Sequence, residues 1–193
     1  MRLKLLVLHF LFVIIVSCKT ATVPYTQSMQ DNLAYMYTTD QEVQTFDDAR
    51  LDDEAYMNAK RAAVDSVWRA NCTIAKDYFS KYSFPGVKEN GYDAALHFWT
   101  IVQHSDHDVE FQAQVLKAME KQLKKNNVSR RNYAYLYDRV KQNLGIEQLY
   151  GTQIDWSTRK AQPYKLKDPE KVNERRKEME LEPIEEYLAA FPH

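Results

Sequence analysis

Residues 93–103 read DAALHFWTIVQ, and this stretch decides the fold. Its apolar side chains point in almost every direction around a helix, and a helix that is apolar all round is normally buried. We therefore expect residues 93–103 to form the central helix of a mainly α-helical, compact bundle. The apolar positions are Ala94, Ala95, Leu96, Phe98, Trp99, Ile101 and Val102.

Four flanking segments carry apolar side chains three and four positions apart, a spacing that predicts amphipathic helices. These segments are residues 27–44, 53–82, 108–124 and 131–144. Gly145 is expected to cap the last of them, because glycine readily adopts the left-handed conformation at helix ends. The chain has only four glycines and six prolines, which favours helices over many short strands.

The chain after residue 149 is less regular. Residues 150–156 and 162–166 are expected to pair as a small β-hairpin. Asp168-Pro169-Glu170 then predicts the start of a helix, with Asp168 as the N-cap and proline in the first turn. A last short helix is expected from Pro183 to Ala190.

Residues 1–17 have the pattern of a bacterial export signal. Arg2 and Lys4 precede an apolar run over residues 5–16, which is too short for a membrane span of about 20 residues. The following Ile15-Val16-Ser17-Cys18 resembles the lipobox of bacterial lipoproteins. An ordinary secretory signal and a short membrane anchor are the alternatives.

The lipobox resemblance implies that the Cys18 thiol carries fatty acyl chains such as palmitate and that the signal is removed before it. Two or more chains hold a protein stably on a bilayer. We therefore expect a lipoprotein attached to a membrane of the cell envelope, the outer membrane if the source is Gram-negative. Residues 18–26 would be the lipidated cysteine and its tether, and residues 27–193 a single helical domain.

The charge and the cysteine content limit which binding partners and which disulfides the sequence allows. Without Arg2 and Lys4 the chain has 24 basic and 27 acidic residues, a net charge of −3, and it lacks the basic stripe of a nucleic-acid-binding protein. The expected partners are membrane lipid through Cys18 and an envelope ligand or protein. With Cys18 lipidated, Cys72 has no partner for a disulfide and is expected to be a small core residue.

The first candidate site is the sequence Gln103-His104-Ser105-Asp106-His107-Asp108, which follows the apolar helix. Imidazole and carboxylate groups so close together could form a general acid/base pair. Their spacing matches no diagnostic metal motif, so we expect no metal and no cofactor. Alternatively, the histidines stabilise the end of one helix and Asp106 or Asp108 is the N-cap of the next.

Two further segments are rich in polar groups. Asp138-Arg139 lies off the apolar face of its helix, either as a solvated pair or with Arg139 holding a carboxylate of the His104 segment. Residues 148–153 read QLYGTQ, and Tyr150, Thr152 and Gln153 could bind a ligand or satisfy buried helix ends.

Together these segments resemble a bacterial domain family of unknown function, whose members carry Q-H-x-D-x-D, D-R-V and Y-G-T-Q segments in this order. The resemblance extends from about Leu33 to Tyr187. It brings no established activity, but it implies that the polar residues serve either one site or one buried hydrogen-bond network. Further matches include Asp40-Gln41, Asp65 with Asn71, Phe84-Pro85, Gly91, Gln112, Gly145, Arg175-Arg176 and Pro183.

The sequence favours a lipid-anchored envelope protein that binds a ligand or partner. The binding residues would be Gln103, Asp108, Gln112, Arg139, Tyr150, Thr152 and Gln153. The alternative is an envelope hydrolase in which His104 is the general base and Asp106 or Asp138 orients it. A nucleophile elbow and a phosphate-binding loop are both missing from the sequence, which makes binding the preferred interpretation.

Overall fold

The computed structural model of the protein describes residues 23–157 and 160–191. The expected export signal, Cys18 and the beginning of the tether lie outside the described residues. Within the described ranges, no helix combines the length and the apolar character needed to cross a membrane.

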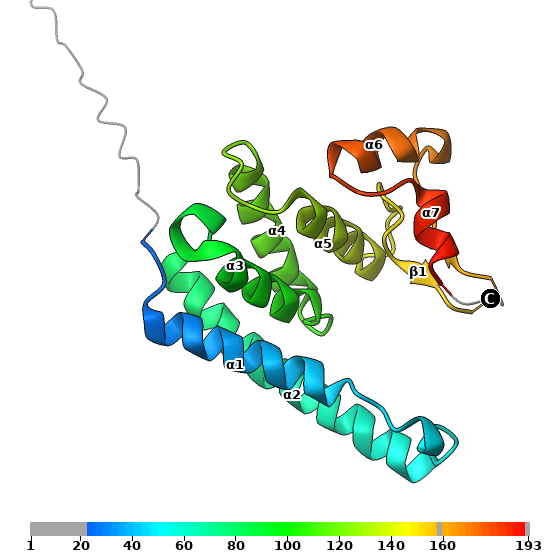
Figure 1. Ribbon diagram of the computed structural model, residues 1–193, viewed down its shortest axis with the longest axis horizontal. Helices are drawn as coiled ribbons and strands as arrows, with labels where there is room; N and C mark the ends of the chain where they lie inside the picture. Colours follow the sequence, from blue (N-terminus) through cyan, green and yellow to red (C-terminus); the bar gives the residue numbers. More distant parts are fainter. Residues whose placement is uncertain (1–22, 158–159, 192–193) are drawn as a thin grey trace, which may run out of the picture.

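The predicted mainly α-helical fold is confirmed (Figure 1). Helices α1 (Gln27–Val43) and α2 (Glu54–Tyr82) pack side by side as a long hairpin, with the short 3-10 helix η1 (Asp48–Arg50) between them. The end of this hairpin that carries η1 projects beyond the rest of the molecule. The chain continues through α3 (Val87–Gln103), α4 (Val109–Leu123) and α5 (Arg130–Asn143).

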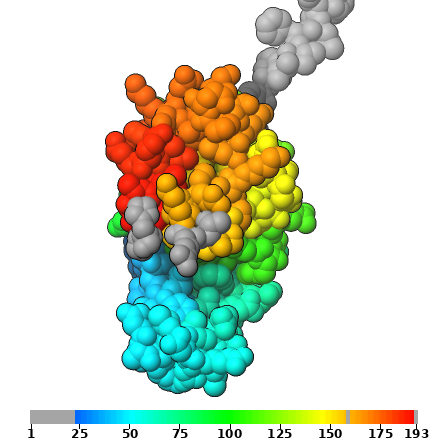
Figure 2. All heavy atoms as spheres, turned by 90° about the vertical axis from the view of Figure 1, so that its right-hand side faces the viewer, coloured from blue at the N-terminus to red at the C-terminus, as the bar shows by residue number. Residues whose placement is uncertain are grey.

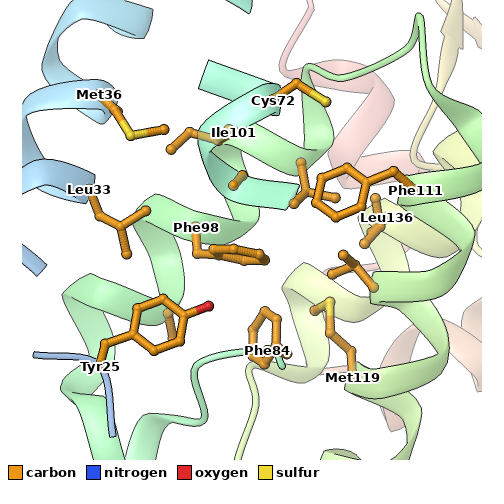
Figure 3. Close-up of a cluster of buried hydrophobic side chains, with 14 of the residues drawn as sticks. Tyr25, Leu33, Met36, Cys72, Phe84, Phe98, Ile101, Phe111, Met119 and Leu136 are labelled. Atoms are coloured by element: carbon orange, nitrogen blue, oxygen red, sulfur yellow. The ribbon is translucent and has the colours of Figure 1, made fainter. Parts of the chain in front are cut away.

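Helix α3 is the centre of the bundle, as its all-round apolar sequence predicts. It packs against α1, α2, α4 and α5. Phe98 is fully buried and lies amid side chains from all sides of the core, including Leu33 of α1, Phe111 of α4 and Leu136 of α5 (Figure 3). Cys72 is also buried in this core and unpaired, and burial raises the pKa of its thiol, which makes it unreactive.

Glycines lie near the start of α3 and at the end of α5. Helix α3 begins at Val87, earlier than the predicted residue 93, but Gly91 interrupts it with a positive φ of 82°. At the end of α5, Gly145 has a φ of 70°, and the next amide, of Ile146, donates to the carbonyl of Lys141. The predicted cap at Gly145 is therefore confirmed.

The C-terminal segment adds the predicted hairpin and two short helices. Strands β1 (Ile154–Asp155) and β2 (Gln162–Pro163) pair antiparallel, with Ile154 opposite Pro163. The 3-10 helix η2 (Pro169–Lys171) precedes α6 (Val172–Glu178), and α7 (Ile184–Ala189) follows. Figure 2 shows this segment (orange to red) on the same face of the molecule as the projecting end of the α1–α2 hairpin (cyan).

The predicted helix start is confirmed, because η2 begins at Pro169 with Asp168 in the N-cap position, but the prediction that Asp168 caps it was wrong. Its side chain makes no capping hydrogen bond, and its φ of 42° is left-handed, whereas an N-cap residue is normally extended. The Arg175 guanidinium donates to the backbone carbonyls of Lys167 and Asp168. This contact with α6 fixes the backbone before η2 in place of a side-chain cap.

Candidate functional site

The turn after α3 is held in shape from both sides. Gln112 of α4 is fully buried, and its Nε2 donates to the backbone carbonyl of Val102 at 3.0 Å. Asp108 is the N-cap of α4, because its side chain accepts from the amide of Phe111 at 3.0 Å. Gln103 is buried at the end of α3, and its Oε1 has no hydrogen-bond partner among the described residues. Gln112 and Asp108 therefore act as supports of this turn.

Asp106 and Arg139 join this turn to α5 by two parallel hydrogen bonds. Arg139 Nε donates to Asp106 Oδ1 at 2.8 Å, and Nη2 donates to Oδ2. Asn143 and Gln112 donate to the same carboxylate at 2.7 and 3.2 Å. Burial alone would raise the pKa of Asp106, but the bonds and charge of Arg139 outweigh it and lower that pKa.

Asp138, the neighbour of Arg139 on α5, is completely buried and contacts the segment that contains residues 149–152. Its carboxylate accepts from the backbone amides of Leu149 at 2.9 Å, Tyr150 at 3.2 Å and Thr152 at 2.9 Å, and from the Thr152 hydroxyl at 3.1 Å. Burial raises the pKa of this carboxyl, and the four donors offset only part of the rise. The solvated alternative for Asp138 is therefore wrong, because a later segment of the chain covers it.

The segment that carries Tyr150 and Thr152 is fixed by further contacts. Gly151 has a φ of 67°, and a Cβ at this position would lie 2.7 Å from Ile184 Cδ1. Arg176, completely buried in α6, donates to the carbonyl of Tyr150 at 2.7 Å. The polar groups of Asp138, Tyr150 and Thr152 thus serve mostly one another and the backbone. We call this set, with Gly151 and Arg176, the Asp138 network.

His104 is oriented by Asp40 of α1. Its Nδ1 lies 2.9 Å from both oxygens of that carboxylate, which is fully buried. The expectation that Asp106 or Asp138 orients His104 was wrong, because Arg139 and the amides of residues 149–152 already occupy those two carboxylates. The polar residues of the sequence motifs therefore gather around three carboxylates, Asp40, Asp106 and Asp138. Gln153 connects the last two groups, because its side chain accepts from Arg139 and donates to the Thr152 hydroxyl.

Next to Arg139 the surface is hollowed into a pocket of about 330 Å³ between α5 and the C-terminal segment. Arg139 Nη1 donates to Gln153 Oε1 at 3.1 Å at this pocket, and the exposed Trp156 is another of its lining residues. We call it the Arg139 pocket. Its described lining residues are Arg139, Gln142, Thr152, Gln153, Ile154, Trp156, Tyr164, Tyr187 and Phe191.

Sequence reasoning gave no role to two groups that complete these arrangements. Asp40 follows Met29, Leu33 and Met36 on the buried stripe of α1, and an acidic residue on such a stripe is the signal that could have marked it. The aromatic residues of the Arg139 pocket come from the chain end and carry no local pattern that relates them to Arg139.

Comparisons with known proteins give a family and no activity. The sequence matches DUF6624, a family of unknown function, over residues 27–192. The chain belongs to this family. Searches of curated proteins and of solved structures found no match. The family relation agrees with the expected domain of unknown function and assigns no chemistry to its residues.

Proposed function

We propose that this DUF6624 protein is a lipid-anchored protein of the cell envelope that binds one unit of a neutral saccharide in the Arg139 pocket. The observation that carries the proposal is the convergence of Arg139, Gln153 and an exposed tryptophan, Trp156, on one hollow. Aromatic walls with a few placed polar groups are typical of small-molecule sites.

The charge and size of the pocket define the ligand. Arg139 is the only charged side chain among the described lining residues, and Asp106 compensates its charge. A neutral ligand therefore fits better than an anion. The volume of about 330 Å³ lies at the lower end of the range for ligand sites, which suits a single sugar ring.

The chemistry of the walls favours a sugar over an apolar molecule. The Trp156 side chain is 61 % exposed, and its ring offers a flat apolar surface to the C–H face of a sugar. Amide groups of Gln142 and Gln153 border the same hollow and can exchange hydrogen bonds with hydroxyls. An apolar ligand would offer the Gln142 amide no hydrogen-bond partner, whereas the Gln153 amide already pairs with Arg139 and Thr152.

The binding experiment uses the full chain in detergent. Titration with glucose, N-acetylglucosamine and cellobiose is followed by isothermal calorimetry. We expect saturable binding of at least one of these sugars, lost in Trp156→Ala and retained in Trp99→Phe. Heats that stay at the dilution level for all three sugars would contradict the proposal.

The anchor rests on the lipobox resemblance at Cys18. We expect the protein to incorporate a labelled palmitate analogue and to partition into the detergent phase of Triton X-114. Cys18→Ala should abolish both, and Cys72→Ala, which removes the buried thiol, should change neither. Labelling that persists in Cys18→Ala would contradict the anchor.

A further inference from the structure

His104 presents a free ring nitrogen beside a buried carboxylate. A carboxylate can only accept, so the 2.9 Å contacts from Nδ1 to both oxygens of Asp40 require the proton to be on Nδ1. The amides of Gln41 and Gln44 donate to the same carboxylate at 2.8 and 3.0 Å. In the neutral imidazole the lone pair is therefore on Nε2.

The ring is held in place while Nε2 stays open. The indole of Trp68 in α2 stacks on the imidazole, with ring centroids 4.9 Å apart and an angle of 22° between the planes. The His104 side chain remains 19 % exposed, and within the described chain no group forms a hydrogen bond to Nε2. An imidazole oriented by a buried acid and open at its other nitrogen has the arrangement of a general base.

An apolar hollow of about 290 Å³ adjoins the same indole. It is lined by Phe46, Arg61, Val64, Asp65 and Trp68, so the residue that stacks on His104 also forms part of its wall. An apolar substituent fits this hollow, and Trp68 is the residue that the hollow shares with the His104 stack. The arrangement does not involve the Arg139 pocket and is independent of saccharide binding.

We propose that His104 is the general base of an esterase site for carboxylic esters with short apolar acyl groups. The oxygen of a water molecule bonds to the ester carbonyl carbon as its proton passes to Nε2, and Asp40 stabilises the imidazolium that results. The tetrahedral intermediate then breaks the bond to the alcohol oxygen. That oxygen takes the proton from Nε2, which releases an alcohol and a carboxylic acid and restores His104.

The test measures release of p-nitrophenol from p-nitrophenyl acetate and p-nitrophenyl butyrate by the full chain in detergent. His104→Asn places an amide N–H where Nδ1 donates to Asp40, but it has no second nitrogen. We expect this variant to keep the unfolding midpoint and to lose at least about 100-fold in kcat. The matched control is His107→Asn, which removes an exposed imidazole three residues away and should leave kcat unchanged.

A pH profile and a chemical modification distinguish a role of His104 as general base from a purely structural role. Wild-type kcat should depend on pH, and the His104→Asn profile should lack this dependence. If His104→Asn does not fold, diethyl pyrocarbonate replaces it, with activity loss expected to follow modification of His104 in peptide mass spectra. Activity that survives His104→Asn or complete modification of His104, or wild-type turnover no faster than that of free imidazole, would overturn the proposal.

Discussion

The Asp138 network and the Arg139 pocket are built on adjacent residues of α5, yet they differ in how many of their polar groups stay accessible to a ligand. Asp138 is sealed and receives four donors from residues 149–152. Arg139 binds Asp106 but also lines a hollow with an exposed aromatic wall. Polar residues alone therefore do not mark a site. A candidate site is marked by the polar groups that remain accessible once the fold has paired the others.

The largest effect is expected from Asp138→Ala. It leaves three backbone amides and one hydroxyl of a buried segment without an acceptor, so we expect the free energy of unfolding to fall by about 3–5 kcal/mol. Urea denaturation measures the loss. The control is Asp77→Ala, which breaks an exposed pair with Lys81 on α2 and should change stability little. Wild-type stability of Asp138→Ala, with sugar binding lost, would make Asp138 part of the site.

Gly151→Ala tests how tightly the same segment is packed. The new Cβ would meet Ile184 at 2.7 Å and force a residue with a side chain to a φ of 67°. We expect a loss of about 2–3 kcal/mol. Gly145→Ala has a similar φ of 70° but open space around the Cβ, and should cost only about 1 kcal/mol. Equal losses in thermal unfolding would show that Gly151 contributes only its backbone conformation.

Gln153→Ala should act on the Arg139 pocket instead. The substitution removes the amide oxygen that accepts from Arg139, while the backbone amide of residue 153 still donates to Gln148. We expect affinity for the sugar that binds to fall about tenfold, which is about 1.4 kcal/mol, with a smaller change in stability. Calorimetry checks this, with the exposed Gln114→Ala as the control of the same residue type. Unchanged affinity would remove Gln153 from the site.

The smallest effect is expected from lowering the pH, which protonates Asp106. Arg139 lowers the folded-state pKa of Asp106, so the stabilisation by this ion pair is present above the ordinary aspartate pKa and is lost as pH falls through the lowered one. Sugar affinity should be constant from about pH 7 down through the ordinary aspartate pKa of about 4 and decline only as pH falls through the lowered pKa of Asp106. Asp106→Asn, which has no charge to titrate, should show no such decline. An affinity that already falls between pH 7 and 5 would assign the dependence to another group.

The sequence predicted the helices because their signals are local. The period of the apolar residues located α1 and α2 to within one residue at their ends, and the all-round apolar stretch identified α3 as central. Helix capping was predicted correctly where it depends on residues adjacent in sequence, as at Gly145. It failed at Asp168, where Arg175 holds the backbone.

The groups around the candidate site were less predictable because their contacts are distant in sequence. His104 and Asp40 are 64 positions apart, and no periodicity relates them. The burial of Asp138 depends on a segment that returns over α5 eleven to fourteen residues later. The motifs thus identified polar residues that matter, but only the fold shows which remain accessible.

The most direct test of this division is an amide and indole NMR titration of the full chain in detergent with the sugar that binds. We expect the largest shift changes at the Trp156 indole and at the amides of Gln153 and Tyr164, with the amides of Leu149 and Tyr150 unmoved because Asp138 holds them. Dominant changes at Leu149 and Tyr150, with a silent Trp156 indole, would contradict the account.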